Sequence, residues 1–399
     1  MPLRFSLSAM LACLFAAMLF IAGCQKKNQQ QPQPVPLPKE VPATPTYHQV
    51  SWQDLPATTD DELVKGFVAW RSSCVKLTQD PVWNQSCVDA ATVPQQAQAI
   101  WQFLHEHLQP YSLRSKDGND QGLITGYFEP VFPGSLKKDA NNKVPVYGVP
   151  DDMIVVSLDT LYPQLKGMRL RGRLEGRVLK PYADAADIRK NGVKAPILAW
   201  MHDPMDLQFM QIQGSGRIRL KNGKQLVLGY ADQNGYPYRP LGRWLLDQGL
   251  LRQDQLSMRR IRQWARQNPK HIDELLASNP SYVFFAVRPD TNEGPRGSLN
   301  VPLTAGYSVA IDRKVIPLGS LLWLSTSKPD GSPLVRPMAA QDTGGAIIGE
   351  VRADLFWGTG DAAGDLAGHM KQPGWVWLLW PKDKPLPVPP PALAPAAQQ

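Results

Sequence analysis

The sequence has few of the residues that build disulfide or metal frameworks, with four cysteines and six histidines in 399 residues. Those counts exclude a disulfide-dense scaffold and leave little material for a zinc site. The pair His105 and His107 does not share a helix face, which argues against a metal there. The glycines after Trp357 lack the spacing of a dinucleotide fingerprint, and no Ser–His–acid set is evident.

The composition is that of a folded protein with unusual ends. Hydrophobic residues make up 43% and charged residues 20%, which is enough apolar mass for a core. A length of 399 residues favours two domains. Many of the 38 prolines lie near the two termini, which indicates tails. The net charge of +8 suggests an acidic partner, either nucleic acid, anionic lipid or an acidic polymer.

The N-terminus reads as a secretory signal over residues 1–23. Arg4 supplies its positive end, and the apolar run of residues 7–22 is short for a membrane span. The run ends in Ile-Ala-Gly before Cys24, which resembles a bacterial lipoprotein signal; an ordinary signal peptide and an uncleaved anchor are the alternatives. The resemblance implies lipidation of Cys24, and Gln25 after it implies sorting to the outer membrane. A periplasmic location excludes nucleic acid and leaves peptidoglycan and anionic headgroups as acidic partners.

Two further cysteines, Cys74 and Cys87, remain in the mature chain. The periplasm is oxidising, so we expect a disulfide between them, with two buried thiols as the alternative.

The chain alternates between helical and strand-like stretches. Residues 25–45 form a Pro/Gln-rich tether and residues 381–399 a second low-complexity tail. Helical spacing runs over 60–109 and returns over 240–278. Short strand-like runs fill 122–231, including the segment DLQFMQIQGSGRIRL from Asp206, and strands return after 280. This order suits two β-rich bodies, one inserted into the other.

Three aspartates in the last strand-rich stretch stand out. Asp342 ends an expected strand and is followed by Thr343, Gly344 and Gly345; the others are Asp312 and Asp354. A carboxylate at a strand end can stand in a cleft, and glycines let a large ligand approach the backbone closely. The alternative is an Asx-type turn in which Asp342 only satisfies backbone N–H groups.

These segments resemble the three-aspartate domain of bacterial cell-wall enzymes, and most closely its version in the membrane-bound lytic murein transglycosylase A family. Four separate segments also match that family in the same order: 125–131 (TGYFEPV), 206–216, 230–242 and 279–285. Residue 129 is Glu where the family has Thr, the residue after Asp342 is Thr rather than Val, and the Pro-rich tails are not a family feature.

The resemblance implies a mainly β fold with helices: a double-psi β-barrel, a second small β-barrel inserted into it, and a groove between them. The expected divisions are a signal peptide (1–23), a tether (24–45), the first part of the catalytic barrel with its helices (46–129), the inserted barrel (130–231), a helical segment with the rest of the catalytic barrel (232–380), and a Pro-rich tail (381–399).

The resemblance also implies an activity. It is the non-hydrolytic, exotransglycosylase-type cleavage of the β-1,4 bond between N-acetylmuramic acid and N-acetylglucosamine, with a 1,6-anhydromuramic product and no cofactor or metal; exo and endo cleavage both stay open. Asp342 would act as acid and then base, with Asp312 and Asp354 as supporting carboxylates. The expected glycan contacts are Thr125, Gly126, Tyr127, Gln213, Ser215, Thr343, Gly344 and Gly345.

Two other functions stay open at this point. Glu129 as a second acid would make the protein a hydrolase. A barrel that binds glycan without cutting it would make the protein a non-catalytic peptidoglycan-binding lipoprotein. The expected partners are peptidoglycan strands, the outer membrane and wall-synthesis proteins.

Overall fold

The computed structural model describes residues 46–165, 168–291 and 293–387. The predicted signal peptide, Cys24 and the tether lie outside the described residues, as does most of the Pro-rich tail. Within those three ranges, no helix is both long enough and apolar enough to cross a membrane.

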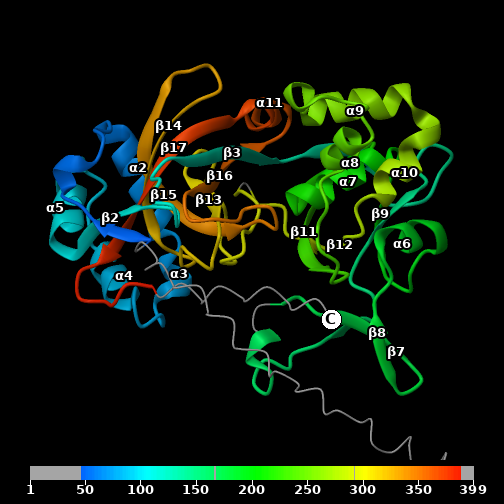
Figure 1. The fold of residues 1–399 in the computed structure, drawn as a ribbon, viewed down its shortest axis with the longest axis horizontal. Coiled ribbons are helices and arrows are strands. Elements are labelled where there is room, and N and C mark those ends of the chain that lie inside the picture. Colours follow the sequence, from blue (N-terminus) through cyan, green and yellow to red (C-terminus); the bar gives the residue numbers. More distant parts are fainter. Residues whose placement is uncertain (1–45, 166–167, 292, 388–399) are drawn as a thin grey trace, which may run out of the picture. The chain divides into compact units, whose positions relative to one another are not determined.

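Six strands close into a β-barrel (Figure 1). The order is β17–β14–β15–β13–β16–β3, and β3 pairs back onto β17. Pairs β13–β15 and β3–β16 are parallel and the other pairs are antiparallel. The strands are β3 (Gly122–Glu129), β13 (Ser308–Ile311), β14 (Leu321–Ser327), β15 (Pro333–Thr343), β16 (Arg352–Thr359) and β17 (Lys371–Pro381). The expected barrel fold is confirmed, and β1 (Tyr47–Gln49) and β2 (Leu108–Leu113) extend its sheet beyond β17.

Helices pack against this barrel in two places. They are η1 (Trp52–Asp54), α2 (Asp60–Arg71), α3 (Cys74–Leu77), α4 (Asn84–Ala91) and α5 (Ala97–His107), with α11 (Asp361–His369) between β16 and β17. The Thr59 side chain caps α2 by accepting from the Glu62 N–H at 3.2 Å, and the apolar residues Leu63, Phe67 and Trp70 repeat at helical spacing and are buried. A Cβ added to Gly66 would lie 2.3 Å from the Pro337 carbonyl oxygen, so glycine is what lets α2 lie directly on β15.

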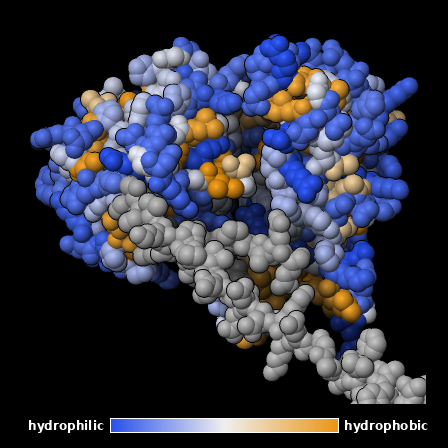
Figure 2. Space-filling model, viewed as in Figure 1, coloured by the Kyte–Doolittle hydropathy of each residue, from blue (hydrophilic) through white to orange (hydrophobic). Residues whose placement is uncertain are grey.

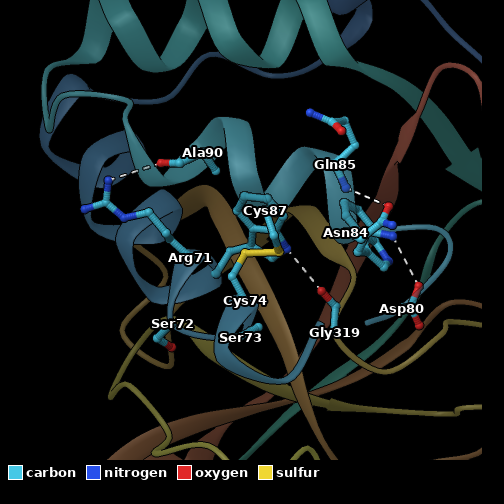
Figure 3. Close-up of a disulfide and its surroundings, with 12 residues drawn as sticks. Arg71, Ser72, Ser73, Cys74, Asp80, Asn84, Gln85, Cys87, Ala90 and Gly319 are labelled. Atoms are coloured by element: carbon cyan, nitrogen blue, oxygen red, sulfur yellow. Dashed lines mark hydrogen bonds between the residues drawn. A yellow bond between two sulfur atoms is a disulfide. The ribbon is translucent and has the colours of Figure 1, made fainter. Parts of the chain in front are cut away.

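A disulfide joins Cys74 on α3 to Cys87 on α4, as expected from the sequence (Figure 3). The bridge lies beside the buried rings of Trp70 and Trp83, whose centroids are 5.6 Å apart. The Trp70 indole N–H donates to the Gly319 carbonyl oxygen at 3.0 Å. The bridge therefore holds two short helices against the barrel at a point where large aromatic side chains fill the core.

A second, six-stranded sheet follows β3 in the chain. Its order is β12–β11–β10–β4–β9–β5, and the rings of Tyr147 and Tyr282, beside its two end strands, lie 6.4 Å apart. The sheet therefore curls toward a small barrel. Its strands are β4 (Val131–Ser135), β5 (Val144–Tyr147), β9 (Ile197–Met201), β10 (Ser215–Arg219), β11 (Gln225–Gln233) and β12 (Val283–Arg288).

Helices also belong to this second body. They are α6 (Ala185–Asn191), α7 (Pro204–Gln213), α8 (Leu241–Asp247), η3 (Gln253–Gln255), α9 (Met258–Gln267), η4 (Pro269–His271) and α10 (Ile272–Ala277). Side chains of α8, α9 and α10 share one apolar core with the second sheet, and β12 pairs with β11. We therefore propose that the insert spans 130–288, further than the expected end at 231. Both bodies lie in the single compact unit 44–399, and Figure 2 shows its surface hollowed between them.

The expectation of an all-β stretch over 122–231 is wrong at two places. Residues 185–191 and 204–213 are helical, and the second of these was expected as a strand. Pro204 occupies the first turn of α7, and the Asp203 carboxylate caps it by accepting from the Met205 N–H at 2.8 Å. The apolar run that follows is buried as a helix because those local signals start one.

A small three-stranded sheet extends from the insert (Figure 1). It consists of β6 (Ile154–Val155), β7 (Arg171–Glu175) and β8 (Val178–Pro181), with η2 (Pro163–Leu165) in the connection. Its apolar side chains Val155, Leu174 and Val178 are more than half exposed.

Replacing Cys74 and Cys87 together by serine is expected to lower the free energy of unfolding by about 3 kcal/mol, because the bridge no longer restricts the unfolded chain. Urea denaturation of the oxidised wild type and the double variant measures this loss. The wild type with a reducing agent is the matched control and should lose the same amount; equal stability of all three samples would contradict the structural role.

Candidate functional site

The site begins at the end of β15. Gln341 is fully buried, and its side-chain amide donates to the Ala69 carbonyl oxygen at 3.0 Å and the Ser73 hydroxyl at 2.9 Å on the helical side. Its carbonyl oxygen accepts from the Ser308 hydroxyl at 2.5 Å. Because successive side chains of a strand point to opposite faces, anchoring Gln341 turns Asp342 the other way.

The strand register places two of the aspartates in one row. Asp342 pairs with Ala310, Ala310 with Asp354, and Asp354 with Thr125 across four neighbouring strands. Residues directly opposite one another share a face of the sheet, and a bulge next to Ala310 adjusts this row. The small side chain of Ala310 therefore separates two carboxylates that stand on the same face.

Four hydrogen bonds hold the Asp342 carboxyl group, whose side chain is partly exposed. The Ser298 N–H and hydroxyl each donate to Oδ1 at 2.9 Å, and the Thr343 N–H donates to Oδ1 at 2.8 Å. The Tyr127 hydroxyl donates to Oδ2 at 2.8 Å. One oxygen thus accepts three hydrogen bonds while the other accepts one.

Desolvation raises the pKa of Asp342 above its usual range, and the donors Tyr127, Thr343 and Ser298 oppose that rise. Burial, followed by the charge of Asp342, also raises the pKa of Tyr127 well above its ordinary value, so the phenol stays a donor. An aspartate in this setting keeps its proton to a higher pH than an aspartate in water.

Asp354 is the second member of the row. Burial raises its pKa to about 6, the Thr125 hydroxyl and the Arg352 guanidinium lower it, and Asp342 raises it. The Thr125 hydroxyl donates to Asp354 Oδ1 at 2.5 Å and accepts from Arg352 Nη2 at 2.8 Å. Thr125 therefore bridges a carboxylate and a guanidinium.

Asp312 holds a loop. It is 9% exposed, and its carboxylate accepts from the Lys314 N–H and the Gly349 N–H, both at 3.0 Å. The second of these bonds fixes the far end of the loop that starts after Asp342. Within this loop Gly344 and Gly345 are exposed, and a Cβ on Gly345 would meet open space. The loop thus presents bare backbone next to Asp342.

The other expected contact residues differ in how they lie. A Cβ on Gly126 would lie 2.6 Å from the Trp357 indole nitrogen, so this glycine serves ring packing. Gln213 accepts from the Phe128 N–H at 3.0 Å through its side-chain oxygen. Ser215 begins β10 opposite Gly229, and within the described ranges its side chain has no hydrogen bond to an aspartate.

Glu129 is not placed to act as a second acid. Its side chain is fully buried, and its Oε2 accepts from Arg217 Nε and the Thr359 hydroxyl, each at 2.8 Å. These hydrogen bonds hold the carboxylate away from solvent and against Arg217 of the insert, so it does not face a bound glycan from the Asp342 side. This removes the two-carboxylate hydrolase that was built on Glu129.

Two residues of the site escape sequence reasoning. Ser298 lies in an irregular segment whose sequence reads only as a turn, and Arg352 is one basic residue among many. Neither belongs to a recognisable motif. The register of β16 with β3 places Arg352, and the path of residues 293–307 places Ser298. Across the described ranges no group of three or more His, Cys, Asp or Glu side chains is placed to hold a metal ion.

The closed barrel, the row of Asp342 and Asp354, and Asp312 at the neighbouring loop define a three-aspartate barrel protein that carries an inserted β domain. Two family models match the chain: "MltA specific insert domain" over residues 123–286 and "3D domain" over residues 307–380. Membrane-bound lytic murein transglycosylase A of Escherichia coli (strain K12) is 32% identical over 277 residues, covering 67% of this chain and 68% of that protein.

Solved structures agree. The crystal structure of MltA from Neisseria gonorrhoeae is similar with a TM-score of 0.75 and 36% identity, over 86% of this chain and 94% of that one. A structure of E. coli MltA with bound chitohexaose has a TM-score of 0.63 and 26% identity, over 84% and 94% of the two chains. The chain belongs to the membrane-bound lytic murein transglycosylase A family.

Tyr127→Phe is expected to raise the pKa of Asp342 further, by about one unit, because a charge-assisted hydrogen bond to the carboxylate is lost. Carbon-13 NMR of labelled aspartate carboxyls across pH measures this, with Asp342→Asn to assign the signal. Tyr307→Phe is the matched control, since its hydroxyl donates to Glu62 at 2.8 Å instead. An Asp342 pKa that is unchanged in Tyr127→Phe would contradict the hydrogen-bond assignment.

Proposed function

We propose that the protein is a lytic transglycosylase that cleaves the β-1,4 bond between N-acetylmuramic acid and N-acetylglucosamine and forms a 1,6-anhydromuramic end. The observation that carries the proposal is one partly exposed carboxyl group, Asp342, with a raised pKa at the edge of an open glycine loop. Family membership and the chitohexaose bound to the E. coli relative support a glycan substrate.

The hydrogen bonds favour one site for the transferable proton. Asp342 Oδ1 already accepts three donors, so the proton of the neutral acid belongs on Oδ2. From there it passes to the glycosidic oxygen as the C1–O4 bond breaks. The resulting carboxylate then takes the proton of the sugar's own C6 hydroxyl, whose oxygen forms the new bond to C1.

This route needs only one carboxylate at the bond being cleaved. An ordinary glycosidase uses two, one as acid and one as base or nucleophile. Here the nucleophile belongs to the substrate, and an intramolecular attack gains from proximity. Asp354 and Asp312 then have supporting roles: Asp354 stands in the same row as Asp342 and holds Thr125 on β3, and Asp312 fixes the glycine loop. The glycan contacts that we propose are the backbone of Gly344 and Gly345, the Thr343 hydroxyl and Ser215.

The location belongs to the same proposal. The relatives are named membrane-bound, and the lipoprotein-like signal that ends at Cys24 provides an anchor. Lipid chains on Cys24 would hold the body at the periplasmic face of the outer membrane, within reach of peptidoglycan and of wall-synthesis proteins.

Asp342→Asn is expected to abolish release of soluble fragments from purified peptidoglycan, by at least about 1000-fold, because no other described group takes over both proton transfers. Chitohexaose binding and thermal unfolding should stay unchanged, since the amide has the shape of the carboxyl. Asp330→Asn, at an exposed turn bond to Ser332, is the control. Substantial turnover by Asp342→Asn would overturn the assignment, and a wild type that binds peptidoglycan without releasing fragments would indicate a binding protein.

The pH dependence follows from the raised pKa of Asp342. The acid must start protonated, so turnover should fall as pH rises through that pKa. Because the pKa lies above the usual range, the fall should begin at a higher pH than for a solvent-exposed aspartate. Initial rates on soluble glycan strands between pH 4 and 8 measure it. A rate that rises through this range would contradict the acid role.

A further inference from the structure

One arginine of the insert contacts both segments that connect the insert to the barrel. Arg217 on β10 donates through Nε to Glu129 Oε2 at 2.8 Å, and its backbone N–H donates to the Pro130 carbonyl oxygen at 2.8 Å. Those contacts lie on the outgoing segment. On the returning segment, Arg217 Nη1 donates to Asp290 Oδ1 at 3.0 Å. The guanidinium of Arg217 therefore contacts the chain both where it enters the insert and where it leaves it.

The pair is buried in a way that fixes geometry more than it adds stability. Glu129 is fully buried and the Arg217 side chain is 13% exposed. The second oxygen of Glu129, Oε1, has no hydrogen-bond partner in the described chain. Buried ion pairs seldom exceed hydrophobic replacements in stability, because desolvation offsets the attraction, and in some proteins their role is to specify one arrangement. A buried pair with one oxygen left without a hydrogen bond is better explained by a role in orienting the connecting segments than by a gain in stability.

The same two segments carry the partners of Asp342. Tyr127, which donates to Oδ2, lies two residues before Glu129 on β3. Ser298, which donates twice to Oδ1, lies eight residues after Asp290 on the returning segment. A third link joins the insert to β3, where Gln213 accepts from the Phe128 N–H. The two acidic partners of Arg217 are thus two and eight residues from donors to the two oxygens of the Asp342 carboxyl group.

We propose that Arg217 is a positioning residue for the reaction: through Glu129 and Asp290 it holds the two connecting segments so that Tyr127 and Ser298 donate hydrogen bonds to the Asp342 carboxyl group. The inference rests on the proposed function, since it assumes that Asp342 is the acid. It assigns a part in the chemistry to a residue of the insert that need not touch the scissile bond.

Weaker hydrogen bonds to the Asp342 carboxyl group would change its pKa, which can be measured. Donors to the Asp342 carboxylate lower its pKa, so weaker bonds raise it. The titratable or charged groups around it are Tyr127 and Asp354, with Arg352 beside Asp354. Arg217→Gln and Asp290→Asn remove charges of opposite sign, so their direct electrostatic effects on Asp342 oppose each other. An upward shift in both variants would therefore come through the connecting segments.

The test is Arg217→Gln in the full chain, with soluble glycan strands as substrate. We expect kcat to fall about tenfold or more with KM nearly unchanged. The pH at which kcat falls on the alkaline side, its high-pH limb, should move upward by about 0.5 pH unit. That is half of the shift that a lost charge-assisted hydrogen bond would give. Arg171→Gln removes another largely buried pair, with Asp232 at 3.0 Å, and should leave the limb in place.

A double-mutant cycle with Tyr127→Phe sharpens the result. If Arg217 acts through Tyr127, the two changes should be clearly non-additive in kcat. Asp290→Asn is the milder variant, because Asp290 is 55% exposed and its change leaves the Glu129 pair intact. It should fold and shift the limb in the same direction by less.

Different results would contradict the positioning role of Arg217 and the proposed function. Lower stability of Arg217→Gln and Asp290→Asn with an unmoved limb would overturn the positioning role and leave a structural one. If Arg217→Gln does not fold, the cycle is made with Asp290→Asn and Tyr127→Phe. An unmoved limb in Asp290→Asn and strictly additive kcat effects in that cycle would also overturn the positioning role. If the wild type itself makes no anhydro product, the proposed function fails first, and chitohexaose binding shows whether the glycan site survives.

Discussion

The structure depends on limiting the contact of one carboxyl group, that of Asp342, with bulk water while hydrogen bonds fix its position. Burial raises the pKa of Asp342, and the donors Ser298, Thr343 and Tyr127 limit that rise. The two effects have opposite signs, so the balance rather than either one sets the protonation state. A group poised in this way can give up a proton and take one back within a single turnover.

The rest of the fold supplies that balance in layers. Gln341 ties the end of β15 to α2, and the Cys74–Cys87 bridge ties the neighbouring helices together. The strand register aligns Asp342 with Asp354, and the insert reaches back through Arg217. The barrel sets where the carboxyl stands, and the two connecting segments set which donors surround it.

Much of this could be predicted from local sequence. Asp342 at a strand end, the glycines after it and the helix with Ile100, Phe103 and Leu104 all follow from short patterns. What could not be predicted depends on distant pairing. Ser298 and Arg352 reach the site through the topology of the barrel, and the lack of a side chain at Gly126 makes room for the Trp357 ring. The strand expected from Asp206 failed because a proline and a capping aspartate start a helix there.

The mass of the products tests directly whether the C6 hydroxyl of the substrate, and not water, attacks C1. Purified peptidoglycan is digested with the protein and the released muropeptides are weighed. Attack by the C6 hydroxyl predicts fragments about 18 Da lighter than the products of hydrolysis, the mass of one water. Fragments with full-mass reducing ends would contradict the route with Asp342 as the single carboxyl group. Water would then be the nucleophile, and a second carboxylate would be required.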